Sequence, residues 1–579
     1  MNNGRTDTVL IITQHSQLLH GNILGTSGWF PPEEREVVDW MTLIRFMGWN
    51  VEIVSPSKFE KGIIEDQNVK WVILTGIAEG YDTRFMRDLL FILQSKPILF
   101  ISQAAVSKSS FANLIGVFTT DTNIDGQELQ WVGKGVQKSW KCHTVIQLGA
   151  IQFATGHTVI CKLDGYPVIT SQKIGNAKII SIGFHSSAAR DLDGVFTALL
   201  KHLLIYESLT PVAWYKWDNT VILRMDDPGS LEVVYNEAYQ NTKLAEEDWC
   251  IIGEELKKRK ARMSLGYVSG WVDDGNTERG ELRVAGETPA RIRGAVYPSP
   301  KVRYEKKNNI NSNIVYNYES EFKGVQNLRK EGLVEVELHG YTHLHPDRQK
   351  WAEAKDRYSN TFWYREFGET AVAFFKSLPV LEQPFYLGIN TLKEYFNIAP
   401  STLICPGDEF TNHVLEQVLE SELLMVSSYY LAIKIGKQLC WAQHICAPYL
   451  NEADAKWFKS ELPVVGYFHD FDISINGVSW FSDCLNKWEE AGAVYLKDFR
   501  EVAGPLSNFL SLYSINGDFE LSVVPNNNFD FITPTRIGLF FPEGAPNKVR
   551  VKICDNEKMI TIDKHANLEI SVTIPSLTI

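Results

Sequence analysis

The stretch Thr220-Val221-Ile222-Leu223-Arg224-Met225-Asp226-Asp227-Pro228-Gly229 decides the fold of the central part of this chain. An apolar run is followed at once by two carboxylates, a proline and a glycine, which is typical of a buried strand that ends in a turn. Further apolar runs follow up to residue 470, with helical patterns between them such as 248–260 and 481–491. This repetition of strand and helix favours a β/α barrel or a doubly wound sheet. The predicted strands are 220–225, 263–268, 334–338, 385–387, 402–405, 424–428 and 464–468.

The first 205 residues also alternate short apolar runs with helical patterns, which indicates a parallel sheet with helices on both faces. This layout resembles the flavodoxin-like α/β domain of class I glutamine amidotransferases. Those enzymes need a Cys on a tight turn between strand and helix, and the matching stretch Ile101-Ser102-Gln103-Ala104-Ala105 contains none. Ser102 lacks the surrounding GxSxG elbow that would activate it. We therefore predict that residues 1–205 form a non-catalytic domain that serves as structure or as a docking surface.

The chain is too long for one hydrophobic core, because its 579 residues correspond to several domains of ordinary size. The last segment alternates polar and apolar residues, as in Phe519-Glu520-Leu521-Ser522-Val523, which predicts a small β-sandwich. The predicted domains are an N-terminal α/β domain at 1–205, a barrel at 211–504 and an accessory β-sandwich at 505–579.

The composition of the chain limits the kinds of partner that we expect for this protein and the cellular compartments in which we expect it. A formal charge of -13 without a basic patch argues against nucleic acid as a partner. The eight cysteines form no CxxC pair, which argues against a disulfide framework and a thiolate zinc site. No run of about 18 apolar residues predicts a membrane span, and the N-terminus shows no export signal. On that basis alone the expected location is cytoplasmic, but the compartment is left open, and no oligomeric state is predicted.

A second polar segment follows a predicted strand at Glu337-Leu338-His339-Gly340-Tyr341-Thr342-His343-Leu344-His345-Pro346. Histidines at i and i+4 can present ring nitrogens to one ion, which they ligate at about 2.0 to 2.1 Å. Adjacent aspartates such as Asp226 and Asp227 are more often turn residues, and a solvated histidine cluster is the alternative for the second segment. Because a barrel gathers the carboxyl ends of its strands at one rim, we expect the two segments to meet.

Together these motifs resemble the polysaccharide deacetylase superfamily, the NodB-homology carbohydrate esterases, whose members have a deformed β/α barrel. The resemblance follows the order of the motifs over residues 220–470. It implies that Asp226 is the general base and that Asp227, His339 and His343 hold a divalent metal. That ion is expected to be Zn²⁺, with Co, Ni, Mn or Fe as alternatives. Relatives commonly act outside the cell.

Two later motifs complete the resemblance. Gly466-Tyr467-Phe468-His469-Asp470 falls where the family has its strand-end general acid, which implies that role for His469. By itself, His469 is more simply a hydrogen-bonded histidine at a strand end. Cys405-Pro406-Gly407-Asp408 falls where the family carries Arg-x-Pro, whose backbone helps to hold the oxyanion. The resemblance therefore assigns substrate contacts to Pro406, Gly407 and Asp408.

The chain departs from the family at three places. The Arg that braces the base is missing before Pro406, and Arg224 takes its place only if its strand stays regular to the end. Asp-Asp-Pro-Gly replaces Asp-Asp-Gly, and His345 offers an alternative metal ligand. These differences affect the prediction of the substrate more than the prediction of the metal.

Trp271-Val272-Asp273-Asp274-Gly275 follows the second predicted strand and offers an aromatic face beside carboxylates. We expect Trp271, Asp273 and Asp274 to contact substrate, with a surface turn as the equal alternative. The leading hypothesis is a metal-dependent hydrolase that removes N-acetyl groups from a sugar polymer or oligosaccharide. The alternatives are a carbohydrate-binding protein that has lost catalysis and a hydrolase of small amides or esters.

Overall fold

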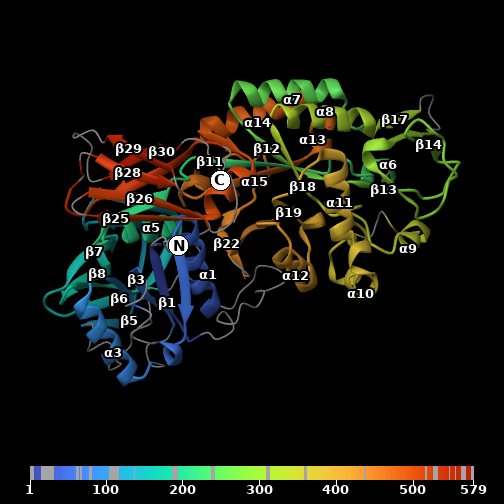
Figure 1. The fold of residues 1–579 in the computed structure, drawn as a ribbon. Coiled ribbons are helices and arrows are strands. Elements are labelled where there is room, and N and C mark those ends of the chain that lie inside the picture. Colours follow the sequence, from blue (N-terminus) through green and yellow to red (C-terminus); the bar gives the residue numbers. More distant parts are fainter. Residues whose placement is uncertain are drawn as a thin grey trace.

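The computed structural model shows a molecule with three groups of sheets, of which the central group carries the candidate site (Figure 1). The residues that it describes are 6–14, 32–59, 64, 68–76, 81–102, 116–135, 137–184, 194–235, 241–307, 313–355, 357, 361–435, 438–515, 518–525, 533–544, 546, 548–553, 556–561 and 569–574.

The N-terminal part is built on one nine-stranded sheet with the order β2-β1-β3-β4-β9-β8-β7-β5-β6. The first five strands of this order are parallel, in the arrangement of flavodoxin-like sheets, and the other four extend the sheet in antiparallel fashion. The strands are β1 (Thr8–Ile12), β2 (Asn50–Val54), β3 (Val69–Leu74), β4 (Leu99–Ser102), β5 (Val117–Trp131), β6 (Lys138–Phe153), β7 (Thr158–Leu163), β8 (Tyr166–Ile174) and β9 (Ala177–Ile182).

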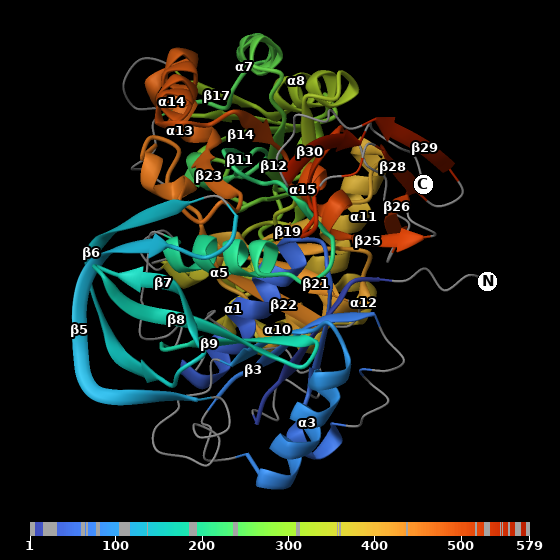
Figure 2. The ribbon, with the colours of Figure 1, turned by 90° about the vertical axis from the view of Figure 1, so that its left-hand side faces the viewer.

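Among the described helices, those that pack on the N-terminal sheet are α1 (Pro32–Phe46), α3 (Thr83–Ser95) and α5 (Val195–Tyr206). The long β5–β6 hairpin curves away from the parallel half as an arch whose upper end lies near the central part (Figure 2). From the sequence, residues 101–105 correspond to the turn that carries the catalytic Cys in glutamine amidotransferases. Of these residues the structure describes only Ile101 and Ser102, at the end of β4.

The central sheet has the order β22-β21-β20-β19-β18-β12-β11-β23, with β24 also paired to β11. From β20 to β23 the strands are parallel, so their carboxyl ends share one edge. No ladder joins β22 to β23 among the described residues, so the sheet is open and the expected barrel is not closed there. The strands are β11 (Thr220–Asp226), β12 (Met263–Tyr267), β18 (Val334–Leu338), β19 (Thr402–Ile404), β20 (Met425–Ser427), β21 (Tyr430–Ile435), β22 (Gln438–Cys446), β23 (Val464–His469) and β24 (Tyr495–Lys497).

Seven of the predicted strand ranges can be compared with these strands. Six of them coincide with β11, β12, β18, β19, β20 and β23. The range 385–387 is wrong, because it lies in helix α11 (Pro384–Phe396), whose Pro384 at the first helical position and apolar spacing suit a helix.

Helices surround the central sheet and short strands form its rim. The helices are α6 (Glu232–Tyr235), α7 (Glu246–Lys258), α8 (Tyr318–Lys330), α9 (Arg348–Glu353), α10 (Glu369–Ser377), α12 (Asn412–Glu420), α13 (Asp470–Asn476), α14 (Val478–Ala491) and α15 (Phe499–Leu506). The rim strands are β13 (Gly270–Val272), β14 (Gly280–Val284), β15 (Val296–Pro298), β16 (Val302–Lys306) and β17 (Ile314–Asn317). The 3-10 turns are η2 (Pro56–Lys58), η5 (Ser299–Lys301), η6 (Thr361–Tyr364), η7 (Val380–Glu382), η8 (Pro406–Asp408) and η9 (Ala455–Phe458). No described helix is long and apolar enough to cross a membrane.

The C-terminal part consists of two small sheets that share one hydrophobic cluster. One has the order β25-β26-β28-β29 and the other the order β10-β27-β30, so strand β10, which precedes the central sheet in the chain, pairs with C-terminal strands. The strands are β10 (Val212–Tyr215), β25 (Asn508–Ile515), β26 (Asp518–Pro525), β27 (Thr535–Phe540), β28 (Lys548–Ile553), β29 (Asn556–Thr561) and β30 (Glu569–Ile574).

A buried ion pair joins the N-terminal sheet to this C-terminal part. Lys70 Nζ lies 2.7 Å from Asp7 Oδ2 and donates to the carbonyl oxygens of Pro211 and Leu512, also at 2.7 Å. Ser511 donates to the other oxygen of Asp7 at 2.8 Å. Because the pair has hydrogen-bond partners at Pro211, just before β10, and in β25, it connects the N-terminal sheet with both segments.

Candidate active site

The two carboxylate residues of the site, Asp226 and Asp227, follow one another at the end of β11. Asp226 is the last residue of the strand and pairs in register with Gly266 of β12 and His469 of β23. Asp227 adopts φ 74°, a left-handed conformation that Asp tolerates better than most residues. This change of backbone direction lets consecutive side chains serve different partners at one strand end.

Asp227, His339 and His343 come together as the sequence predicts. Asp227 Oδ1 lies 3.3 Å from His339 Nε2 and 3.6 Å from His343 Nε2, and the three ligand atoms lie within 4.8 Å of one another. Tetrahedral zinc with ligands at about 2.0 to 2.2 Å places neighbouring ligand atoms about 3.3 to 3.5 Å apart. The spacing therefore fits one small cation, and all three side chains are buried.

The outer nitrogens of both histidines face fixed acceptors. His339 Nδ1 donates to the carbonyl oxygen of Ile404 at 2.9 Å, and His343 Nδ1 lies 3.1 Å from Glu232 Oε1. This arrangement holds the rings with Nε2 turned toward Asp227, as second-shell partners do at metal centres. Asp227 Oδ1 thus lies close to both Nε2 atoms, which suits three ligand atoms that would share one metal ion.

The pKa shifts agree with this arrangement. Burial alone would raise the pKa of Asp227, but the hydrogen bond with His339 and the charges of His343 and His339 outweigh it and lower that pKa well below its usual value. Burial would lower the pKa of His343, yet Glu232 and Asp227 together raise it to about 10. The carboxylates thus attract positive charge to this point, and a divalent cation would take the place of the proton on His343.

Glu366 organises the turn that carries His343. Its buried carboxylate accepts from the backbone N–H groups of Tyr341 at 2.7 Å, Thr342 at 3.1 Å and His343 at 3.2 Å, and from the Thr342 hydroxyl at 2.9 Å. Gly340 and His343 both have positive φ, so the turn needs this support. A Cβ at Gly340 would collide with the same carboxylate, which explains the glycine.

His469, at the end of β23, stands next to Asp226 and is held by two side chains. Its Nδ1 lies 3.0 Å from the Tyr449 hydroxyl, which donates to Asp472 Oδ2 at 2.5 Å. Burial alone would lower the pKa of His469, but the hydrogen bond to Asp472 and the charges of Asp227 and Asp226 raise it to about 9. The ring is therefore an imidazolium at neutral pH.

Arg224 reaches Asp226 from the same strand, which requires the strand to stay regular to its end. Its Nε donates to Asp226 Oδ1 at 2.9 Å, and a second nitrogen donates to Oδ2 at 2.5 Å. The guanidinium also donates to the Ser428 carbonyl oxygen at 3.1 Å and to Asp408 Oδ1 at 3.2 Å. This fork-to-carboxylate geometry is the one that Arg forms most strongly, so Arg224 holds the Asp226 carboxylate in one orientation.

The 406–408 turn borders the site through its backbone and one carboxylate. Pro406 is buried, Gly407 is exposed, and Asp408 contacts Arg224. The Asp408 N–H donates to the Cys405 carbonyl oxygen at 2.9 Å, so it already has an acceptor. His345, the alternative ligand, is not brought to the cluster: its Nε2 faces the Thr370 carbonyl oxygen at 3.3 Å and its Nδ1 accepts from the Asp347 N–H.

Trp271, Asp273 and Asp274 do not present the accessible surface that was expected of substrate contacts. Trp271 is 0% exposed inside an aromatic cluster, and Asp273, also 0% exposed, binds Arg291 at 2.7 Å. Asp274 is buried beside the same arginine at 3.0 Å. Their ring face and carboxylates already have protein partners, and their burial does not match the alternative of a surface turn either.

Lys243 supports the site from behind Asp227. Its ammonium donates to the Asp227 carbonyl oxygen at 3.2 Å, pairs with Asp470 and lies 3.3 Å from Glu321 Oε1. The other oxygen of Glu321 accepts from the Gly229 N–H at 2.8 Å. This buried cluster therefore connects the turn after β11 with the residue that follows His469.

Several residues that shape the site were not predicted from the sequence. Asp472 had a local signal, because an acid three residues after a strand end can accept from the first N–H of the next helix, as it does from His469 at 2.8 Å. The other supporting residues lie far along the chain from the groups that they contact, and no local pattern marks them: Glu232, Lys243, Glu321, Glu366 and Tyr449.

Comparison with known proteins gives likenesses to solved structures and no sequence match. No family model matches the chain, and no curated protein is similar to it. A structure titled Agd3, a novel carbohydrate deacetylase, aligns over 99% of both chains at 8% identity with a TM-score of 0.42. A CE4 family pseudoenzyme from Bacillus anthracis aligns over 49% of this chain and 66% of its own at 8% identity, with a TM-score of 0.26. The β-galactosidase of Bacillus circulans sp. alkalophilus aligns over 31% of this chain at 14% identity with a TM-score of 0.23, and this chain spans 28% of its length.

Proposed function

We propose that this protein is a metal-dependent hydrolase that removes N-acetyl groups from a sugar polymer or oligosaccharide. One observation carries the proposal: two consecutive carboxylates, two metal-competent histidines and a third histidine, from three separate segments, meet at the carboxyl edge of the central sheet. A set of base, metal ligands and acid is what amide hydrolysis by activated water needs.

Asp227, His339 and His343 would hold the divalent ion, with Zn²⁺ favoured and Co, Ni, Mn or Fe as alternatives. One carboxylate and two imidazoles match that donor preference and leave positions for water and substrate. When bound, such an ion supplies Lewis-acid activation of water and of the acetamide carbonyl.

Asp226 acts as the general base in this proposal. Its two oxygens are oriented by Arg224, and its register places it beside His469 on one side and Gly266 on the other. The carboxylate takes a proton as water attacks the acetyl carbon. Arg224 fixes the direction of the carboxylate, so this residue has a positioning role.

His469 acts as the general acid. Its pKa of about 9 keeps the proton on the ring at neutral pH, and the Tyr449–Asp472 pair holds Nδ1, which leaves Nε2 as the nitrogen for proton transfer. The proton goes to the sugar nitrogen as the carbon–nitrogen bond breaks. Without that proton the amine is a poor leaving group.

Residues at the edge of the site would supply the oxyanion donor and the contacts with the sugar. The Gly407 N–H is the proposed oxyanion donor, because the Asp408 N–H is already bonded to Cys405. A donor of this kind contributes about 3 to 4 kcal/mol in comparable sites. Tyr467 and Phe471 are partly exposed and flank His469 at ring separations of 5.9 and 4.7 Å, so they replace Trp271 as aromatic candidates for sugar contact.

The test is release of acetate from N-acetylated oligosaccharides such as chitin oligomers, combined with metal analysis. Wild type is expected to bind about one equivalent of metal and to release acetate, since a site with three ligands retains its ion. Asp226→Asn should keep the metal and lose acetate release, whereas Asp227→Ala should lose both. The exposed Asp88 provides the matched control as Asp88→Asn, which should behave as wild type.

Two results would contradict the proposal. Less than about 0.2 equivalents of metal in the wild type would favour a carbohydrate-binding protein without catalysis. Release of acetate from small esters or amides but from no N-acetyl glycan would favour the small-molecule hydrolase.

A further inference from the structure

An exposed tyrosine lies at the same edge of the central sheet as the candidate catalytic groups. Tyr429 belongs to the turn that follows β20 and is 63% exposed. Strands β20, β11 and β23 run parallel in one sheet, so the turn after β20 lies at the same edge as Asp226 and His469. The ring is therefore available to a ligand that reaches the site.

The buried guanidinium of Arg224 connects this turn with the proposed base. It holds both oxygens of Asp226 and also donates to the carbonyl oxygen of Ser428, the neighbour of Tyr429, at 3.1 Å. In the sheet order β20 and β11 are separated by β19, β18 and β12, so this contact requires the sheet to curl around the site. One side chain thus spans from the base to the turn that carries Tyr429, which puts this turn beside the reacting groups.

Two further side chains of the rim lie around the same guanidinium. Tyr467 of β23 is partly exposed, and its ring centre lies 5.5 Å from Arg224 Cζ. Asp408 Oδ1 accepts from Arg224 at 3.2 Å, and the Asp408 side chain is 17% exposed. Burial raises the pKa of Tyr467 above its ordinary value. Asp408 and Tyr429 raise that pKa further, while Arg224 lowers it, so these groups lie near the same hydroxyl.

Together these three side chains offer the contacts that a sugar ring requires. The partly exposed rings of Tyr429 and Tyr467 can cover the apolar C–H face of a pyranose. Asp408 Oδ2 has no hydrogen-bond donor among the described residues, so it can accept from a sugar hydroxyl. A ring bound here lies beside Asp226, so it would be the neighbour of the sugar that carries the acetyl group.

The charges at this place favour a sugar without a negative charge. The side chain of Arg224 is 2% exposed and already pairs with two carboxylates, so it does not offer its charge to a ligand. Arg365, which lies beside Gly407, pairs with Glu409 at 3.1 Å. The Asp408 carboxylate would repel a uronate or a phosphate, so we expect the bound sugar to be neutral.

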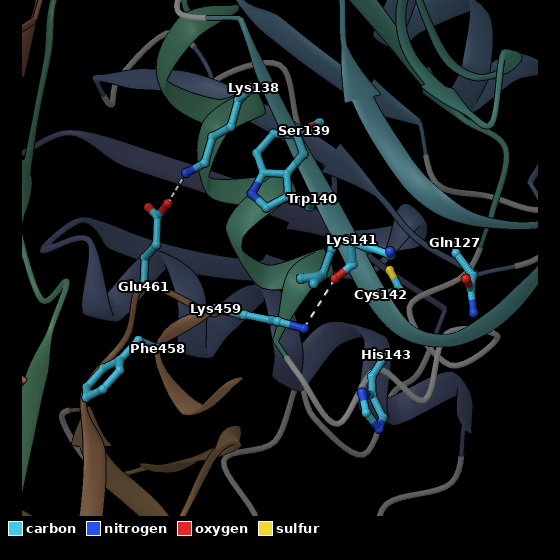
Figure 3. A pocket seen from close by; sticks show the side chains of 11 residues that line it. Gln127, Lys138, Ser139, Trp140, Lys141, Cys142, His143, Phe458, Lys459 and Glu461 are labelled. Carbon is cyan, nitrogen blue, oxygen red and sulfur yellow. Dashed lines mark hydrogen bonds and ion pairs between the residues drawn. The ribbon is translucent and has the colours of Figure 1, made fainter. Parts of the chain in front are cut away.

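The cavity between the N-terminal sheet and the central part does not take this role. It has a volume of about 470 Å³ and is lined by β6 and by residues that include Phe458 and Glu461 (Figure 3). Glu461 precedes β23 and pairs with Lys138, whereas His469 ends that strand. A strand of this length spans about 20 Å, so a sugar in that cavity would not be the neighbour of one at the metal site.

We propose that Tyr429, Tyr467 and Asp408 form a subsite for the neutral sugar next to the acetylated one. The protein then acts on chains of two or more sugars and discriminates against N-acetyl monosaccharides and small amides. The inference rests on the proposed function, which places the acetylated sugar at Asp226. Tyr429 determines specificity through binding, because it does not touch the reacting atoms.

The first test measures acetate release from N-acetylglucosamine and from the chitin disaccharide and tetrasaccharide. In the wild type kcat/KM should rise about tenfold or more from the monosaccharide to the disaccharide, because the second ring adds binding. Tyr429→Ala should lose most of this gain through a higher KM, and Tyr429→Phe, which keeps the ring, should retain it. Tyr166→Ala, at a position of β8 that is 57% exposed, is the matched control and should behave as wild type.

A second test measures binding without turnover, so it is independent of the proposed catalysis. Calorimetric titration of Asp226→Asn with the chitin tetrasaccharide gives the Kd. This Kd should rise about tenfold when Tyr429→Ala is added and stay the same when Tyr166→Ala is added. If the wild type releases no acetate and the difference in Kd is still found, the proposed function fails and the subsite remains.

Three results would overturn the subsite even if acetate is released. The first is an equal kcat/KM for the monosaccharide and the disaccharide. The second is binding of the tetrasaccharide that Tyr429→Ala does not weaken. The third is tighter binding of a hyaluronan tetrasaccharide, in which every second sugar carries a carboxylate, than of the chitin tetrasaccharide.

Discussion

At the scale of single residues, the side chain that sets the protonation of His469 is Asp472. The hydrogen bond to Asp472 acts against burial, which alone would lower the pKa of His469, and helps to raise it to about 9. An acid catalyst works only while protonated, so activity should fall as pH rises through that pKa. Asp472→Asn removes one of the groups that raise the pKa, and we expect the alkaline limb of kcat/KM to move to lower pH.

The pH dependence of kcat/KM between pH 6 and pH 10 measures this shift. At pH 6 the variant should retain most of the wild-type rate, because the ring is still protonated there. Asp483→Asn, an exposed change on α14, is the control. An alkaline limb in the same place for Asp472→Asn and wild type would show that His469 is not the acid.

At this scale the candidate site residues could be predicted from the sequence, and the residues that support them could not. Asp226, Asp227, His339, His343 and His469 stand at strand ends, where apolar runs stop, and this local signal can be read from one sequence. The residues that hold these side chains in position are distant from them in the sequence, as Tyr449 is from His469. The burial of Trp271 could not be predicted in this way, because its turn pattern is local but its burial depends on the packing of distant aromatic residues.

At the scale of elements, strand β12 must pass between the base and a metal ligand without a side chain in the way. Gly266 fills that place: a Cβ there would lie 3.3 Å from Asp226 Oδ1 and 3.1 Å from His339 Cγ. Neighbours this close must shift by a few tenths of an ångström. We expect Gly266→Ala to lower kcat about tenfold or more and to weaken metal binding, since such sites tolerate little displacement.

Gly466 of β23 offers the matched control for this change. A Cβ there would be as crowded, at 3.2 Å from Leu450 and 3.3 Å from Val221, but only apolar side chains would move. Both variants should lose some thermal stability, while Gly266→Ala alone should lose metal affinity, measured by titration with Zn²⁺. Equal metal affinity in the two variants would contradict the placement of the site around β12.

The elements themselves were predicted to different degrees. Most central strands were found because buried parallel strands are short continuous apolar runs. Closure of the barrel was not predictable, because whether a sheet closes depends on strand tilt and on pairing between its two ends, which leave no periodic mark in the sequence. The pairing of β10 with β27 was not predicted for the same reason.

At the scale of the whole molecule, Glu461 fastens the N-terminal part to the central part. Burial alone would raise the pKa of Glu461, but the charges of Lys201 and Lys138 and their hydrogen bonds lower it to about 2, from an ordinary value of 4.5. A carboxyl group whose pKa is lower in the folded state stabilises that state above its unfolded pKa, and the contribution is lost as pH falls toward the folded value. The shift corresponds to about 3 kcal/mol near neutral pH.

Glu461→Gln should therefore lower the Tm at pH 7, and the difference from wild type should shrink steadily below about pH 4.5, where the unfolded carboxyl begins to take up protons. Scanning calorimetry from pH 7 to about pH 3.5 follows this change. Glu490→Gln, an exposed substitution on α14, controls for loss of a surface charge. Because Glu461 contacts lysines on both β6 and α5, the calorimetric trace should also show the N-terminal part melting earlier, as a separate step. A Tm difference that does not depend on pH would mean that packing, and not this ion pair, holds the two parts together.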